Sequence, residues 1–305
     1  MIIDIASCDD HFAARTTRQD WQRITAFRHH PNFLNGVRHY ANSMLPFFAT
    51  SKILNKVIVE AWRFQMLALT LWLYETMDPD DPRSGLTVAN LQRLCADLGL
   101  ASPGRVFALI QIMRAGRFLE VTPSGPDRRV KRFLPTPKFM GSVEEWNGNI
   151  LAAIDLSQSN SHLTDQAARL PNLKRGMRTR GAQGLIDGWD PLLPFPEVKF
   201  FSGFDGGYPL MIYVARQAIG NDGLLRTGPI NVDLRKRANS FGGSRTNLAN
   251  LLDRAYTEGM LSEPHSMGSH VVFAPRTICS FLGFVASYLS NFEIHALAGT
   301  VPDAY

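Results

Sequence analysis

The sequence of residues 86–136 is LTVANLQRLCADLGLASPGRVFALIQIMRAGRFLEVTPSGPDRRVKRFLPT. Four apolar residues at helical spacing predict a first helix with one buried face: Leu91, Leu94, Cys95 and Leu98. Gly99 is expected to end this helix, because glycine accepts the left-handed backbone that often follows a helix.

A second helix is predicted directly after the turn, with Ser102 as N-cap and Pro103 as the first helical residue. Its apolar face is Val106, Leu109, Ile110 and Met113. Gly116 is expected to end it by adopting a left-handed conformation. Two short β-prone runs then flank a Pro/Gly turn, which predicts a hairpin with four basic residues: Arg128, Arg129, Lys131 and Arg132.

The same order of parts recurs from Val232 onward. Leu91, Leu98 and Gly99 correspond to Leu234, Phe241 and Gly242 at an offset of 143 residues. Ser102 corresponds to Ser244 at an offset of 142, and Val106, Leu109, Ile110 and Met113 correspond likewise to Leu248, Leu251, Leu252 and Ala255. The second hairpin is shorter, and Pro135 is expected to match Pro275. A shared register with length changes confined to loops indicates an internal repeat.

Length and composition are those of a folded protein of two repeated parts. With 305 residues, we expect an extension at 1–50, a first domain at 51–140, a helical and irregular linker at 141–207, and a second domain at 208–305. The net charge of +5 permits a polyanionic partner without requiring one. We see no secretory signal and no run long enough to span a bilayer, so a cytoplasmic protein without membrane contact is expected.

The sequence contains no clear motif for a disulfide framework, a metal site or a catalytic site. Cys8, Cys95 and Cys279 are far apart and odd in number, so reduced structural thiols are expected, without a disulfide framework or zinc site. His265 and His270 favour a surface turn over a metal site. The nucleophile-elbow, P-loop, zincin and dinucleotide-binding motifs are missing, so neither an enzyme nor a cofactor is expected.

The helices outside the repeat are predicted from their apolar patterns. A long helix is expected at 51–77, another at 137–156, and a terminal apolar helix at 277–297. The basic segment 171–184 has two interpretations, a solvated linker or an arm that lies on phosphates. The segment 189–209, rich in Pro, Gly and aromatic residues, is expected to be an irregular connector.

The second helix of the second unit carries side chains suited to reading bases. Once its apolar residues turn inward, the outward residues are Arg245, Thr246, Asn247 and Asn250. Arg235, Lys236 and Arg237 on the preceding helix suit phosphates. The first unit offers Ser102, Arg105 and Gln111 on its second helix, with the basic hairpin beside them. The alternative is that these charges only solvate two exposed helices.

These features resemble winged helix-turn-helix transcription regulators, most nearly the MarR-like class. The resemblance covers roughly residues 51–136 and 208–297 and implies a mainly α fold with small β wings: tandem winged helix-turn-helix domains joined by helices. It implies that Arg105 and Gln111 read bases in one unit. In the other unit, the base-reading residues would be Arg245, Thr246, Asn247 and Asn250. The resemblance also implies that the basic hairpin contacts DNA. Members of this class often respond to small aromatic ligands, which implies an effector pocket near Trp62, Phe64, Trp72 and Tyr74. The alternative, which an aromatic stripe on a long helix favours, is that these residues belong to the core.

The expected partner is double-stranded DNA, bound by a monomer that imitates a dimer or by a homodimer. MarR-like proteins usually carry one winged unit per chain, so two units in one chain depart from that pattern. A plasmid-type replication initiator is one alternative. A scaffold whose tandem winged units bind a partner protein, without DNA, is the other.

Overall fold

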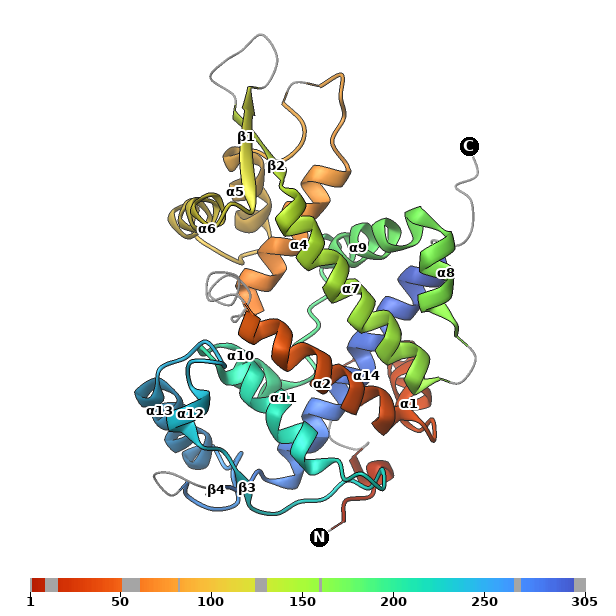
Figure 1. The fold of residues 1–305 in the computed structure, drawn as a ribbon, viewed down its shortest axis with the longest axis vertical. Coiled ribbons are helices and arrows are strands. Elements are labelled where there is room, and N and C mark those ends of the chain that lie inside the picture. The colour runs from red at the N-terminus through yellow and green to blue at the C-terminus, as the bar shows by residue number, and fades with distance from the viewer. Residues whose placement is uncertain are drawn as a thin grey trace.

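A computed structural model describes residues 2–8, 16–50, 61–81, 83–123, 131–158, 161–265 and 270–298. The fold is mainly helical with two small antiparallel sheets (Figure 1). The first half contains η1 (Ile5–Cys8), α1 (Arg18–Arg28), α2 (Phe33–Thr50), α4 (Ala61–Glu75), α5 (Val88–Asp97), α6 (Pro103–Ala115), β1 (Leu119–Pro123), β2 (Lys131–Pro135) and α7 (Pro137–Ser157). The second contains α8 (Leu163–Arg169), α9 (Pro171–Ile186), α10 (Pro196–Ser202), α11 (Gly207–Ala218), β3 (Ile230–Asn231), α12 (Leu234–Arg237), α13 (Arg245–Thr257), β4 (His270–Val271) and α14 (Pro275–Ala298).

The long apolar helix α14 passes through the middle of the molecule and contacts α1, α7, α9, α10 and α11 (Figure 1). It confirms the predicted terminal apolar helix, and most of its residues are buried. Among the described residues it is the one helix long and apolar enough to cross a bilayer, but 83% of that apolar stretch is buried inside the protein. The sequence of α14 is therefore explained by its place in the core.

Helix α2 lies along α7 and also contacts α11. The two helices approach closely at Gly36, where an added Cβ would lie 1.8 Å from Ser157 Oγ and 2.5 Å from the Ala153 carbonyl oxygen. Only a residue without a side chain fits there. The predicted extension 1–50 thus contributes α2 to the core, where Phe33 and Val37 are fully buried.

The turns that follow α5 and α12 share one set of backbone hydrogen bonds, although the order of elements is α5, α6, β1, β2, α7 in the first segment and β3, α12, α13, β4, α14 in the second. In the first, Gly99 N donates to Ala96 O and Leu100 N to Cys95 O, closing α5 with Gly99 left-handed at φ 62°. In the second, Gly242 N donates to Asn239 O and Gly243 N to Ala238 O, with Gly242 at φ 82°. Both turns close helices in the pattern that needs one left-handed residue. The two predicted glycine turns are confirmed.

The helices that follow these turns, α6 and α13, have the same length of 13 residues and the same buried positions. Ser102 and Ser244 are their N-caps, and the residues predicted to be buried are buried. The helices end alike: Phe118 N donates to Met113 O, and Met260 N donates to Ala255 O. The repeat therefore extends from the glycine turns, through α6 and α13, to the turns that end these two helices.

The ends of these helices correct two predictions. Gly116 has φ −75°, and the left-handed residue is Arg117 at φ 58°, which corresponds to Gly259 at φ 68°. Gly116 is the C-cap, so the left-handed position falls one residue later. The counterpart of Pro275 is Pro137, because both begin the helix after the hairpin. The offset is thus 142 before the hairpin and 138 after it, and the second hairpin is four residues shorter.

Several other expectations differ from the structure. The predicted counterpart of the ten-residue α5 is α12, which has only four residues and is followed by turns at 238–242. The 189–209 connector contains the helix α10, whose Val198 and Phe201 are buried. The helix 137–156 is confirmed as α7, whereas only the part of the 51–77 helix from Ala61 lies among the described residues.

Cys8 and Cys279 form a disulfide, with their Cα atoms 5.3 Å apart, so the expectation of three reduced thiols is wrong. The two cysteines are 271 residues apart in sequence, and folding brings η1 onto α14. The spacing of cysteines in the sequence does not predict a pairing over such a separation. Cys95 is a free buried thiol, and burial raises its pKa to about 11.

Candidate nucleic-acid interface

The outward face of α13 carries the predicted base-reading residues. Ser244 Oγ accepts a hydrogen bond from Asn247 N at 3.0 Å, which fixes the first turn of the helix. Leu248, Leu251 and Leu252 point into the core and orient the opposite face outward. The exposed residues on that face are Arg245, Thr246, Asn247 and Asn250. Their side chains are free to meet the donor and acceptor groups of base edges.

The cations before α13 differ in their exposure. Arg235 and Lys236 are exposed on α12, and Lys236 Nζ is 3.6 Å from Asp233 Oδ2. Arg237 is half-buried, and its guanidinium lies 4.4 Å from the centre of the Tyr213 ring. Arg237 thus packs on α11, whereas the other two are available to phosphates.

Helix α6 has the same position in the first unit but a different outward face. Arg105 is exposed, and its guanidinium lies 5.4 Å from the Trp62 ring centre. Gln111 is half-buried, and its Oε1 accepts a hydrogen bond from Arg114 Nη1 at 3.2 Å. Ser102 is exposed and caps α6 without a side-chain hydrogen bond. The polar groups on this face are therefore fewer and partly engaged.

The predicted wing contacts are only partly within the described residues. Lys131 is exposed at the start of β2. Arg132 is half-buried, and its guanidinium donates to the backbone carbonyl of Asp81. Arg128 and Arg129 lie outside the described residues. Of the four predicted basic residues, Lys131 is the one that the structure describes as exposed.

Two basic residues that the sequence did not single out hold the far ends of α6 and α13. Lys138 Nζ donates to Gly116 O at 2.8 Å, and Arg276 Nη2 donates to Glu258 O at 2.7 Å. Each is the second residue of the helix that follows the hairpin, so the arrangement is the same in both units. A positive charge at a helix C-terminus also interacts favourably with the helix dipole. The Pro-Lys and Pro-Arg pairs at 137–138 and 275–276 are the signal that could have revealed them.

The basic segment 171–184 is neither a solvated linker nor an arm on phosphates, because it forms the helix α9 and its cations are paired. Arg178 donates from Nε to Glu75 Oε1 at 2.8 Å and from Nη1 to Glu144 Oε1 at 3.0 Å. Lys174 Nζ contacts Glu144, while Arg175 and Arg180 donate to backbone carbonyls of α4 and α14. These cations tie α9 to its neighbours.

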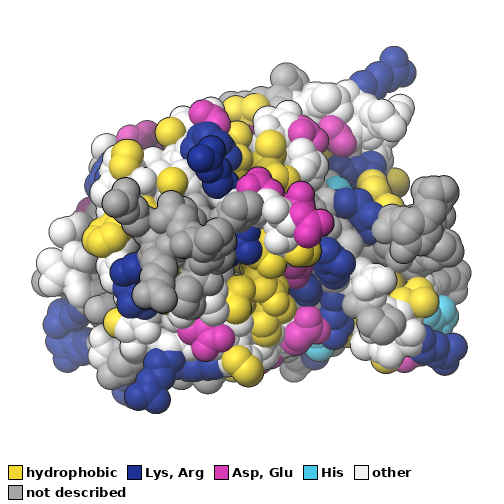
Figure 2. Space-filling model, turned by 90° about the horizontal axis from the view of Figure 1, so that it is seen from above, with side chains coloured by type: hydrophobic (Ala, Val, Ile, Leu, Met, Phe, Trp, Pro, Cys, Tyr) yellow, Lys and Arg dark blue, Asp and Glu magenta, His cyan; other side chains and the backbone are white. Residues whose placement is uncertain are grey.

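Figure 1 shows α6 and α13 on the same side of the molecule, at the left. The β1–β2 hairpin lies at the top and the two-stranded β3–β4 sheet at the bottom. Seen from above in Figure 2, Lys and Arg side chains form several separate groups among acidic and apolar ones. No single basic patch of described residues covers the face seen in Figure 2.

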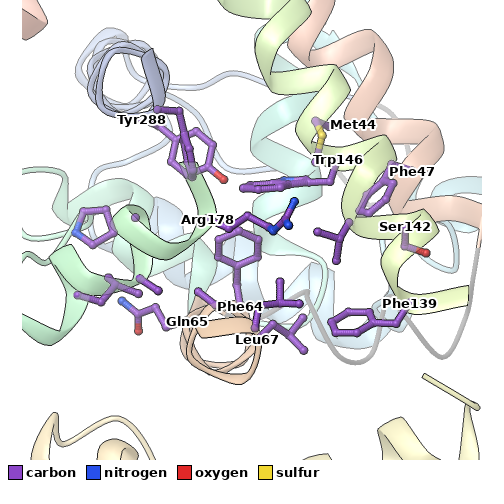
Figure 3. A pocket seen from close by; sticks show the side chains of 18 of the residues that line it. Met44, Phe47, Phe64, Gln65, Leu67, Phe139, Ser142, Trp146, Arg178 and Tyr288 are labelled. Atoms are coloured by element: carbon purple, nitrogen blue, oxygen red, sulfur yellow. The ribbon is translucent and has the colours of Figure 1, made fainter. Parts of the chain in front are cut away.

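An apolar cavity of about 120 Å³ lies among α2, α4, α7, α9 and α14 (Figure 3). It is lined mainly by aromatic and aliphatic side chains, including Phe47, Phe64, Trp146 and Tyr288, and Arg178 reaches its wall. Of the four residues expected near an effector, Phe64 lines this cavity, and Trp62 lines another pocket beside α10. An apolar cavity of this size suits a single aromatic ring. The aromatic effector itself stays a prediction.

In the part of the chain that the structure describes, no group of three His, Cys, Asp or Glu side chains could hold a metal ion. His265 Nδ1 instead lies 3.2 Å from Asp253 Oδ1 on α13. Comparisons with protein families, characterised proteins and solved structures found no match to this chain. The geometry is therefore the basis for assigning a function.

Proposed function

We propose that this protein is a sequence-specific, double-stranded-DNA-binding regulator with two winged helix-turn-helix units in one chain. The observation that carries the proposal is the repeat of α6 in α13: equal length, a serine at each N-cap, and buried residues at equal positions. Both helices lie on the same side of the molecule (Figure 1), and each has exposed residues opposite its buried ones. A duplex along that side would meet both helices, as two half-sites meet the two halves of a dimer.

The chemistry of α13 supports base recognition. An arginine can bond both acceptors of guanine in the major groove, and an asparagine can bond both polar groups of adenine. Arg245 and Asn250 are exposed on one helix face with Thr246 and Asn247 beside them. The two units present different residues, so the protein would recognise an asymmetric or imperfectly palindromic site. The two units of one chain would then bind the two half-sites that a dimer binds with two subunits.

Salt dependence tests the proposal against a protein scaffold that does not bind DNA. The full chain is titrated with selected genomic fragments at 50 and 200 mM salt. If six or more phosphates are neutralised, affinity should fall by about 10³-fold or more over this range, because bound counterions are released. Binding that is equally weak at both salt concentrations, or a flat response, would favour the scaffold.

A further inference from the structure

The outward face of α6 is apolar where that of α13 is polar. At equivalent positions α13 carries Thr246, Asn247, Ala249 and Asn250, and α6 carries Gly104, Arg105, Phe107 and Ala108. Phe107 is 50% exposed and Ala108 is exposed beside it. Ile112, one turn beyond Ala108, is 40% exposed, so α6 turns two large apolar residues outward, and an apolar surface of this kind marks an interaction site.

The charges around Phe107 argue that the occupant of this site is part of a polyanion. Helix α6 contains Arg105 and Arg114 and no carboxylate, and both arginines are exposed. Lys131 is exposed on the adjoining hairpin. An apolar centre with a basic surround complements the major groove, where the thymine C5-methyl is an apolar group between two phosphate backbones.

Resting on the DNA-binding function proposed above, we infer that α6 reads thymine methyl groups through Phe107 and Ala108, while α13 reads bases by hydrogen bonds. Phe and Ala side chains contact thymine methyls in major grooves, and neither can bond to a base edge. The two half-sites would then be recognised by different chemistry, methyl contacts in one and hydrogen bonds in the other. The α6 half-site contains thymines at the contacted positions, and the α13 half-site is specified by polar groups.

Deoxyuridine substitution tests this inference in the full-length chain. DNA sites are selected from genomic fragments, and the α6 half-site is the one that stays protected in the Arg245→Ala variant. Each thymine there is replaced by deoxyuridine, which keeps base pairing and removes only the methyl group. Each contacted methyl should contribute about fourfold to affinity, and deoxyuridine in the α13 half-site should have a smaller effect.

A matched pair of variants assigns the effect to Phe107. In Phe107→Ala the response to deoxyuridine should shrink toward onefold, whereas Leu156→Ala, which trims a residue 46% exposed on α7, should keep the full response. An α6 half-site indifferent to deoxyuridine, or a full response in Phe107→Ala, would overturn the inference and leave DNA binding intact. If Phe107→Ala instead dissociates an oligomer in light scattering, the face joins copies of the chain and the inference is wrong. Failure to select any DNA would overturn the proposed function itself.

Discussion

Replacing Arg245, Thr246, Asn247 and Asn250 together by alanine should lower affinity for the selected site by about 10³-fold. The estimate assumes that one arginine and one asparagine each make a bidentate base contact, worth roughly 2 kcal/mol apiece. All four side chains are exposed, and the Ser244 cap bonds to a backbone N–H that the substitutions keep. Fluorescence anisotropy with the selected site and a scrambled duplex measures the loss.

A charge-matched control separates base reading from simple charge removal. Arg169→Ala also removes one positive charge, from the exposed surface of α8, on the other side of the molecule from α13 (Figure 1). It should leave the preference for the selected site over scrambled DNA unchanged, whereas the fourfold variant should lose that preference. Equal behaviour of the two variants would show that α13 does not read bases.

The variant Arg178→Met should lower the free energy of unfolding by about 3–5 kcal/mol, because it leaves a buried carboxylate without its counter-charge. The side chain of Glu75 is 5% exposed and that of Arg178 is 9% exposed. Lys174→Met is the matched control, because the Lys174–Glu144 pair is 28% and 42% exposed and should contribute at most about 1 kcal/mol. Urea unfolding compares the two variants.

The pH dependence of this loss identifies its cause. Burial raises the pKa of Glu75 above its ordinary value of 4.5, although Arg178 acts to lower it. The folded state therefore holds this proton more tightly than the unfolded state, and stability falls as pH rises through the folded pKa. Without Arg178 that pKa rises further, so Arg178→Met should be less destabilising near pH 4.5 than at pH 7. A loss independent of pH, not reduced by adding Glu75→Gln, would show that Glu75 is not its source.

The parts predicted from sequence are those set by local rules. Ser102 and Pro103 are the N-cap and first residue of α6, as expected, and Gly99 is left-handed. The buried positions of α6 and α13 follow from helical spacing, and the repeat supports one with the other. The exposure of Arg245 and Asn247 follows from the same spacing, because the core takes the opposite face.

The parts that sequence did not predict depend on contacts between distant segments. The basic residues of α9 were predicted to lie in a solvated linker or on phosphates. Their carboxylate partners, Glu75 and Glu144, are far away in sequence, on α4 and α7. Arg132 looked like a free wing cation, but its acceptor is the backbone of Asp81. Helix α2 was not predicted, because Pro46 and several polar residues interrupt its helical apolar pattern. Its buried face is recognisable only from its contact with α7.

Hydroxyl-radical footprinting of the full chain on a selected fragment tests most directly whether both units bind one duplex. We predict two protected segments on the same face of the DNA, about 10 base pairs or a multiple of that apart, with one of them lost in Arg245→Ala. One protected segment, lost as a whole in that variant, would contradict the account.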